Sequence, residues 1–324
     1  MAHRVVPALA ASCVLLCVSC ASAYAQAWPA RPVRVIAPFA PGGTADTLGR
    51  VVSAKLAESL GQSFIVENRT GAGGVVGSEV AAKSAPDGYT LVVSGVASHV
   101  IAAALTKVPF DPLRDFTHIA LFGGPPAALA VHPSLPAKDL KTFIALARSR
   151  PGQLTYGSPG NGTQGHLVAH LLQGSAGVDI RHVPYRGASL AVADAIAGNI
   201  HAISTTLSTA SGQIRSGRLR ALALSSEERL PDYRDIPTFR ELGFAQLVAT
   251  VWFGLSGPAG IPADIVSKLN AEVARILALR EVRDRLRAEG MELAGANAKP
   301  YAAFVASEIE RWTPIVRASG AKAD

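Results

Sequence analysis

Short apolar segments of strand type alternate with amphipathic segments of helical period along most of this chain. In its first third, strands are predicted at residues 33–37, 64–66 and 91–94, and helices at 47–60 and 74–82. Glycine and proline stand at the switches between them. This alternation is typical of α/β folds, in which a mostly parallel sheet is covered by helices on both faces.

A second series of the same kind follows a linker, Gly123-Gly124-Pro125-Pro126, that we interpret as a hinge. Strands are predicted at 128–131, 155–156, 180–183, 202–205 and 219–224, with helices at 140–148, 163–172 and 189–197. A strand at 251–255 and two long helices, at 262–278 and 299–319, then complete the chain. With 324 residues, the chain is too long for one average domain. We therefore expect two lobes, with residues 26–125 and 249–324 in the first and 126–248 in the second, and a second hinge segment near residues 247–252.

The N-terminus has the order of a secretory signal. A basic start at His3 and Arg4 precedes an apolar stretch and the small residues 21–25, which predicts a signal peptide over 1–25 and a periplasmic protein. The three cysteines, Cys13, Cys17 and Cys20, all lie in this segment, so a disulfide framework or cysteine nucleophile is not expected in the mature chain. Lipidation at Cys20 is the alternative, and it would tether the protein to a membrane.

The formal net charge is +7, but the basic residues are scattered or paired with acids. Without a basic block interleaved with aromatic residues, nucleic-acid binding is not expected. The histidines show no metal-ligand spacing: His166 and His170 are four apart, but Leu167 stands where metalloprotease chemistry needs a glutamate. We expect neither a metal nor a cofactor.

The strongest local signal is a buried strand that opens through Pro41-Gly42-Gly43 onto a helix. Glycines let a ligand approach the backbone, and the free amides of a helix start can bind an anion. An ordinary turn capped by Thr44 or Asp46 explains the same residues equally well.

A similar loop, residues 156–167, recurs in the second series and offers the hydroxyls of Ser158 and Thr163. Two such loops on two lobes could face each other across a cleft and hold a carboxylate. A third junction, residues 183–188, carries Arg186, which either points into that cleft or is an ordinary solvated cation.

Catalytic motifs are weak. Ser158 lacks the G-x-S-x-G spacing of a hydrolase nucleophile, and the glycines of residues 71–77 lack the spacing of a dinucleotide site. No pair of carboxylates indicates general acid–base catalysis. We expect no catalytic residue, with an extracytoplasmic hydrolase dependent on Ser158 as the less favoured alternative.

Taken together, these motifs resemble one family in order along the whole mature chain: the solute-binding proteins of tripartite tricarboxylate transporters, also called Bug receptors. The matching segments are residues 28–34, Pro41-Gly42-Gly43-x-x-Asp46, 66–74, Pro86-Asp87-Gly88-Tyr89-Thr90-Leu91, 156–167, Pro184-Tyr185-Arg186-Gly187, 236–243, 252–262 and 308–312.

The resemblance implies a two-lobed, type II periplasmic-binding-protein fold that closes on a small carboxylate. It further implies a monomer that delivers this ligand to the membrane subunits of a transporter or to a sensor kinase. The ligand-binding residues that it implies are Phe39, Gly43, Thr44, Ala45, Asp46, Ser94, Ser98, Ser158, Gly162, Thr163, His166, Arg186, Gly187 and Thr205.

One position departs from the family pattern. Many members carry an aspartate in the strand at residues 202–206, where this chain has hydroxyl residues, with Thr205 in about that place. A carboxylate there would favour an amino-bearing ligand, so its absence favours a simple mono- or dicarboxylate or an aromatic acid over an amino acid.

Overall fold

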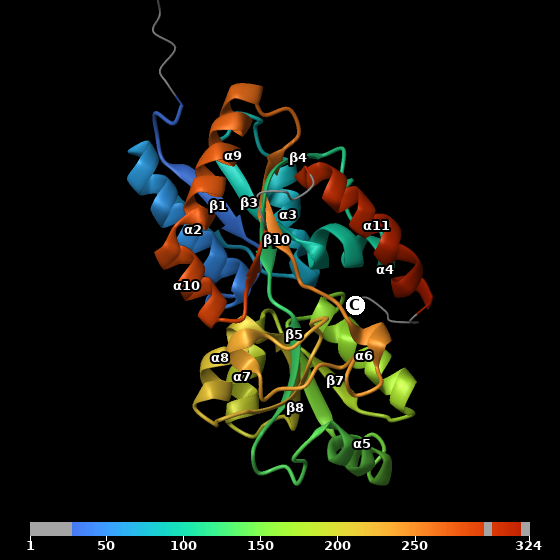
Figure 1. Cartoon of the computed structure of the whole chain (residues 1–324). Coiled ribbons are helices and arrows are strands. Elements are labelled where there is room, and N and C mark those ends of the chain that lie inside the picture. The colour runs from blue at the N-terminus through green and yellow to red at the C-terminus, as the bar shows by residue number, and fades with distance from the viewer. Residues whose placement is uncertain (1–27, 295–299, 319–324) are drawn as a thin grey trace, which may run out of the picture.

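The computed structural model describes residues 28–294 and 300–318, which form two α/β lobes joined at a narrow waist (Figure 1). The chain begins in the upper lobe of this view, builds the lower lobe, and returns to the upper lobe for its last helices. The predicted signal peptide and Cys20 lie outside the described residues. Within the described ranges, no helix combines the length and apolar character needed to cross a bilayer.

The sheet of the first lobe has six strands in the order β11-β4-β10-β3-β1-β2. Strands β1 to β3 pair in parallel, whereas β10 runs antiparallel to both β3 and β4, and β11 runs antiparallel to β4. The strands span Val33–Ala37 (β1), Phe64–Asn68 (β2), Thr90–Gly95 (β3), Phe116–Gly124 (β4), Phe253–Pro258 (β10) and Glu292–Leu293 (β11).

The sheet of the second lobe has five strands in the order β7-β6-β8-β5-β9. Strands β6, β7 and β8 pair in parallel, and β5 runs antiparallel to β8 and β9. Their bounds are Ala127–Val131 (β5), Thr155–Ser158 (β6), Arg181–Pro184 (β7), Ala202–Thr206 (β8) and Arg220–Leu224 (β9).

The fold class is as predicted, and the reversed strands have a simple cause. In each sheet most strands run toward the waist. Strand β5 and strand β10 are the strands by which the chain enters a lobe from the other one, so they start at the waist and run away from it, as does the short edge strand β11. The carboxyl ends of the remaining central strands therefore meet between the lobes, which is where ligands sit in open α/β sheets.

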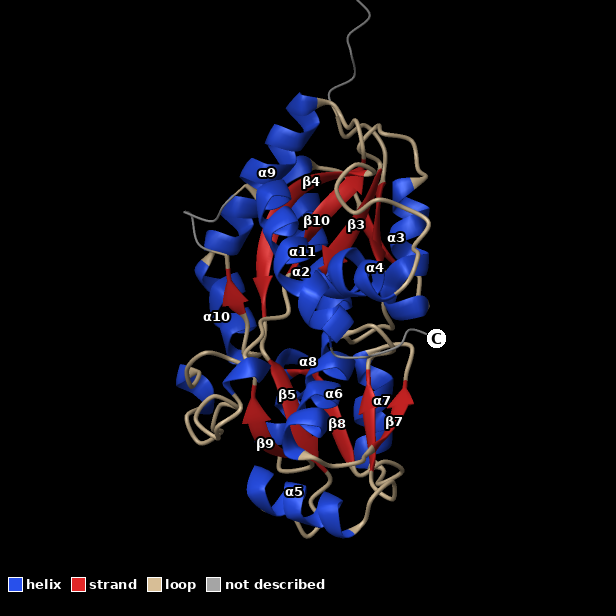
Figure 2. Ribbon diagram, turned by 90° about the vertical axis from the view of Figure 1, so that its right-hand side faces the viewer, coloured by secondary structure: helices blue, strands red, loops and turns tan. Residues whose placement is uncertain are grey.

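Helices cover both faces of each sheet (Figure 2). In the first lobe, alternate residues of the central strands face different cores: Val35 and Val93 contribute to the core beside α2, and Ile36 and Val92 to the core beside α3. The helices of this lobe are α2 (Thr44–Leu60), α3 (Val75–Ala82), α4 (Ala102–Leu105), α9 (Ala263–Ala278), α10 (Arg280–Ala288) and α11 (Tyr301–Ala318). Those of the second lobe are α5 (Leu140–Ser149), α6 (Gln164–Ala176), α7 (Ala188–Ile196) and α8 (Leu207–Arg215).

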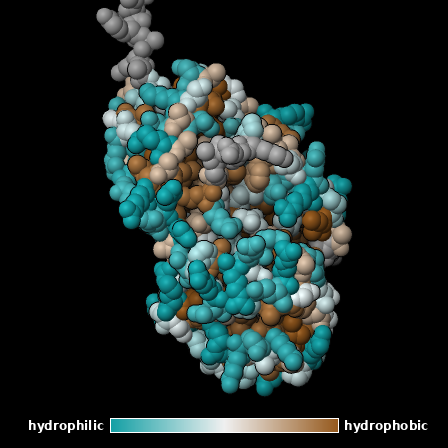
Figure 3. Space-filling model, in the orientation of Figure 1, coloured by the Kyte–Doolittle hydropathy of each residue, from teal (hydrophilic) through white to brown (hydrophobic). Residues whose placement is uncertain are grey.

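Two crossing segments form the waist, which is visible as a constriction in Figure 3. The amide of Val251 donates to the carbonyl of Pro125 at 3.0 Å, and Pro126 pairs with Thr250. The segments approach so closely that a Cβ on Gly124 would lie 1.5 Å from the Val251 carbonyl oxygen. Only glycine fits at this crossing.

Candidate functional site

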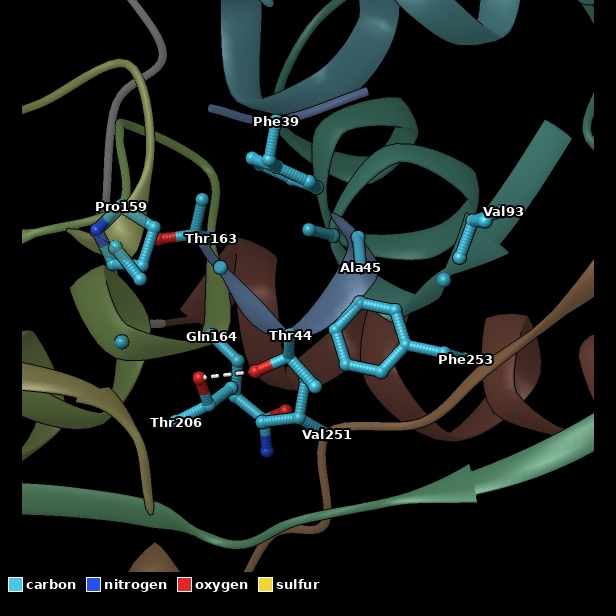
Figure 4. A pocket seen from close by; sticks show the side chains of 15 residues that line it. Phe39, Thr44, Ala45, Val93, Pro159, Thr163, Gln164, Thr206, Val251 and Phe253 are labelled. Carbon is cyan, nitrogen blue, oxygen red and sulfur yellow. Dashed lines mark hydrogen bonds between the residues drawn. The ribbon is translucent and has the colours of Figure 1, made fainter. Parts of the chain in front are cut away.

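A cavity of about 50 Å³ lies between the lobes (Figure 4). One water needs roughly 10–15 Å³, so in this closed arrangement the cavity has room for a few water-sized groups. The residues that line it are Phe39, Gly43, Thr44, Ala45, Val93, Gly95, Ala97, Pro159, Thr163, Gln164, Gly165, Ala188, Thr206, Val251 and Phe253. None of these fifteen carries a charge, and most of their side chains are apolar.

The start of α2 forms one wall. Gly43 is the N-cap residue, in an extended conformation (φ −83°, ψ 169°), and it makes no side-chain capping bond. The amides of the first helical turn, at Thr44, Ala45 and Asp46, have no acceptor within the helix. Since Thr44 and Ala45 line the cavity, this wall presents the positive end of a 17-residue helix to it.

Asp46 holds this loop from behind and does not line the cavity. Its carboxylate accepts hydrogen bonds from the Gly42 amide at 2.9 Å, from Asn68 Nδ2 at 2.9 Å and from Arg50 Nε at 3.0 Å. Burial raises the pKa of Asp46, but the hydrogen bonds from Arg50, Gly42 and Asn68 outweigh it, so the pKa lies below its usual value. Its role in this structure is to position the loop.

Replacing Asp46 by asparagine is expected to lower the free energy of unfolding by about 1–3 kcal/mol at neutral pH, because charge-assisted hydrogen bonds are lost. A carboxyl whose pKa falls on folding stabilises the fold above its unfolded pKa of about 4, and this contribution is lost as the pH drops through the folded pKa. The deficit of Asp46→Asn should therefore shrink below about pH 4. Urea unfolding at several pH values measures this loss in free energy of unfolding, with the exposed Asp235→Asn as control. A loss that does not change with pH would contradict the stabilising role of the Asp46 carboxylate.

The start of α6 forms the facing wall. The Thr163 side chain caps this helix by accepting from the His166 amide, and its hydroxyl donates to the Gly160 carbonyl at 2.7 Å. Gly165 packs so tightly on β8 that a Cβ there would lie 2.2 Å from the Ser204 carbonyl oxygen. The first turn of α6 is thus held closely against the sheet.

Hydroxyl groups join the two lobes beside the cavity. Thr44 Oγ1 lies 2.6 Å from Thr206 Oγ1, 2.6 Å from Ser208 Oγ and 3.2 Å from Thr209 Oγ1. Ser189 Oγ donates to the Pro41 carbonyl at 2.7 Å. These contacts link the start of α2 directly to β8, α7 and α8, so the structure represents a closed arrangement.

Gly187 makes a close approach to the opposite lobe. Its backbone has φ 153°, and a Cβ would lie 2.6 Å from Ala40 Cβ and 2.8 Å from the Ala40 nitrogen. The Ala40 amide also donates to the Arg186 carbonyl at 3.3 Å. Gly187 therefore contributes close backbone packing to lobe closure, beside the cavity and not in its lining.

Two predicted site residues lie inside the first lobe instead. Ser94 is fully buried and hydrogen-bonds with Ser256 Oγ (2.6 Å) and Tyr301 OH (2.8 Å), which ties β3 to β10 and α11. Ser98 is also fully buried and lies 2.9 Å from Nδ1 of His99. Neither lines the cavity, although their neighbours Gly95 and Ala97 do.

Ser158 and His166 belong to a buried histidine cluster in the second lobe. Ser158 Oγ lies 2.7 Å from Nε2 of His182, whose ring stacks on that of His166 with centroids 4.4 Å apart. Burial, together with His166 and His170, lowers the pKa of His182 to about 3. Ser158 is fully buried and lines none of the described cavities, so this serine–histidine pair does not favour a nucleophilic role.

The remaining predicted residues lie at the edges of the site. Gly162 and Arg186 line an outer groove of about 750 Å³ that shares Phe39 and Pro159 with the cavity. Thr205 is fully buried in the second lobe, and its hydroxyl has no partner among the described residues. Of the predicted set, the structure brings together around the cavity Phe39, Gly43, Thr44, Ala45 and Thr163.

Gln164 and Thr206 are the polar cavity residues that the sequence analysis missed. Thr206 immediately follows the predicted Thr205, and Gln164 immediately follows the capping Thr163. Its position inside the predicted loop at residues 156–167 was the available signal for Gln164. The apolar wall residues Val93, Val251 and Phe253 carried no such signal.

A family model described as the tripartite tricarboxylate transporter family receptor matches residues 48–321. The chain belongs to this receptor family. Family members are solute-binding receptors, and the chain is 37% identical over 301 residues to protein BugT of Bordetella pertussis, with 92% of each chain covered.

Solved structures of similar proteins agree with this assignment to the tricarboxylate-receptor family. One is Rpa4515 of Rhodopseudomonas palustris with adipate, with a TM-score of 0.87, 33% identity and coverage of 91% of this chain and 99% of that one. Another is MatC from the same organism with bound malate, with a TM-score of 0.85, 35% identity and coverage of 89% and 100%. The predicted family and two-lobed periplasmic-binding-protein fold are therefore confirmed.

Proposed function

We propose that this protein is a periplasmic receptor that captures a small carboxylate by closing its two lobes over it. The observation that carries this proposal is the start of α2, where a glycine N-cap leaves the first-turn amides uncapped by any side chain and directed to an interlobe cavity. A helix N-terminus carries roughly half a positive charge, and carboxylates bind favourably there.

The chemistry of the lining supports an anion held by backbone dipoles. Among the described residues no basic side chain lines the cavity, so its electropositive groups are backbone amides at two helix starts, those of Thr44 and Ala45 in α2 and those of Gln164 and Gly165 in α6. No acidic side chain lines it either, and the nearby Asp46 is engaged by Arg50, Asn68 and Gly42. An amino-bearing ligand would find no counter-charge, which agrees with the hydroxyl residues at the end of β8.

Similar receptors bind ligands of this class. The two R. palustris structures hold adipate and malate, both small carboxylates. For this chain we propose Phe39, Gly43, Thr44, Ala45 and Thr163 as the residues that surround the ligand, with Asp46 and Gly187 as supporting residues. The segments 123–126 and 247–252, which cross at the waist, are the proposed hinge between residues 26–125 with 249–324 and residues 126–248.

We further propose that the bound carboxylate is delivered to the membrane subunits of a tripartite tricarboxylate-type transporter, as the family description suggests. A receptor that reports to a sensor kinase would use the same site. Uptake of the radiolabelled ligand in a strain that lacks this receptor separates the two: transport predicts loss of uptake, and signalling predicts loss of a transcriptional response with uptake retained.

Thermal unfolding of the mature chain, stripped of carried-over ligand by unfolding and refolding, tests carboxylate binding. A ligand at one hundred times its Kd stabilises the native state by about 2.7 kcal/mol. We expect at least one member of a panel of aliphatic and aromatic mono- and dicarboxylates to raise the Tm, while the corresponding neutral amide does not. A folded protein whose Tm no carboxylate raises would contradict the proposal.

A further inference from the structure

Gln164 is the first residue of α6 and is buried in the wall of the interlobe cavity, with only 2% of its surface exposed. Both polar atoms of its side-chain amide, Nε2 and Oε1, lack a hydrogen-bond partner among the described residues. Figure 4 shows it beside Thr44 and Thr206, in the region where the walls of the two lobes meet.

The other polar side chains of the cavity are already engaged. Thr44 and Thr206 hydrogen-bond to each other at 2.6 Å, and the Thr163 hydroxyl donates to the Gly160 carbonyl. No hydrogen bond joins any of them to Gln164. A buried amide left without partners costs about 1–3 kcal/mol, so such groups in native proteins normally have a use.

The position of Gln164 is held by the backbone around it. Thr163 caps the same helix end, and Gly165 packs against the Ser204 carbonyl oxygen with no room for a Cβ. The amide is thus presented from a fixed helix terminus, opposite the α2 amides on the other lobe.

A primary amide donates through Nε2 and accepts through Oε1. A ligand group that satisfies both atoms must itself donate and accept, as a hydroxyl or a carboxamide does. A second carboxylate would only accept, so it would leave Oε1 facing negative oxygens, and none of the described side chains that line the cavity carries a positive charge to offset the buried one. An ammonium would only donate and would leave Nε2 unpaired.

We propose that Gln164 is a specificity-determining residue that selects carboxylates that also carry a neutral donor–acceptor group, a hydroxyl or a carboxamide. This inference rests on the proposed function. The α2 amides hold the carboxylate, the apolar side chains Phe39, Val93 and Phe253 enclose the ligand body, and Gln164 hydrogen-bonds to the neutral polar group of the ligand.

Isothermal titration calorimetry on the stripped mature chain tests this with matched ligands. The probes are butyrate, pentanoate and hexanoate, their 2-hydroxy and ω-hydroxy derivatives, the dicarboxylates succinate, glutarate and adipate, and the half-amides of these three. The ω-amino derivatives complete the set. At the chain length that binds best, the wild type should bind a hydroxyl- or carboxamide-bearing ligand at least about tenfold tighter than the unsubstituted, methyl-tipped one.

Gln164→Leu keeps the side-chain bulk and removes the amide. We expect it to bring the preference to within about twofold while the methyl-tipped ligand still binds. Gln164→Glu, which can only accept when ionised, should shift the preference toward the ω-amino ligand. Gln153→Leu, a change of an exposed glutamine in the second lobe, is the matched control and should leave the preference unchanged.

An unaltered preference in Gln164→Leu would overturn the inference while leaving carboxylate capture intact. So would a wild type that binds the dicarboxylate more tightly than either neutral-tipped ligand, or that binds only carboxylates without a donor–acceptor group. If no carboxylate at all binds the folded wild type, it is the proposed function that fails. The two failures are therefore distinguishable.

Discussion

Replacing Gly43 by aspartate is expected to abolish carboxylate binding and leave the fold intact. Gly43 has ordinary backbone angles for any residue, and a Cβ there meets only the Ala40 carbonyl oxygen, at 3.4 Å. Aspartate is also a favoured N-cap residue, so its own carboxylate should bond the first-turn amides of α2 and raise stability by about a few tenths of a kcal/mol.

The loss of binding has two causes in this variant. The new carboxylate occupies the amides that the ligand needs, and it repels the ligand's charge. Two like charges about 4 Å apart near a protein surface repel by about 4 kcal/mol. We expect the Kd, measured by calorimetry with the ligand found in the thermal panel, to rise by at least about a hundredfold.

Two matched variants separate these causes. Gly43→Asn caps the helix without adding charge and should weaken binding less than Gly43→Asp does. Gly43→Ala neither caps nor adds charge and should weaken it least. Unchanged affinity in Gly43→Asp, with the protein shown folded by circular dichroism, would remove this loop from the binding site.

Replacing Gly187 by alanine is expected to prevent full closure of the lobes. The added Cβ would lie 2.6 Å from Ala40 Cβ on the opposite lobe, closer than two carbon atoms can approach. Closure is what encloses the ligand, so the Kd should rise at least about tenfold. Small-angle X-ray scattering should show that saturating ligand no longer compacts the variant to the wild-type radius of gyration.

Gly198→Ala is the control for this variant. Gly198 also has a positive φ, 76°, and lies in the same lobe, but a Cβ there meets nothing within 4 Å. Both variants carry backbone strain, but only Gly187→Ala obstructs closure of the lobes. If Gly198→Ala weakens binding as much as Gly187→Ala does, the effect comes from strain in the second lobe and not from contact between lobes.

The strand-to-helix loops were predictable because their signals are local. Gly42 and Gly43 after a buried strand, and Thr163 before an amphipathic helix, indicate loops at the carboxyl ends of strands, and the structure places Gly43 and Thr163 on facing walls of one cavity. Helix α2 begins at Thr44, earlier than the predicted residue 47, because the chain turns into the helix directly after the glycines.

Residues whose environment depends on distant segments were harder to place. Ser94 is the last residue of the predicted strand at 91–94, where a site residue is expected, but its partners Ser256 and Tyr301 come from β10 and α11, more than 150 residues away. No local pattern indicates that these side chains meet. Ser94 is therefore part of the packing of the first lobe.

Thr205 and Thr206 show how one residue decides the outcome in a strand. Successive side chains of a strand point to opposite faces, so Thr205 is buried in the sheet while Thr206 reaches the cavity. Thr206 is also the N-cap of α8, a helix we did not predict. Its sequence is rich in serine and threonine, and burial of Leu207 and Ala210 stabilises it through tertiary packing.

A crystal structure of the mature protein with its tightest-binding carboxylate tests the central claim most directly. We predict closed lobes with one carboxylate oxygen about 2.7–3.2 Å from the backbone amide nitrogens of Thr44 and Ala45. A carboxylate bound elsewhere, such as beside Lys107 and Arg186 in the outer groove, with the α2 amides left free, would contradict it.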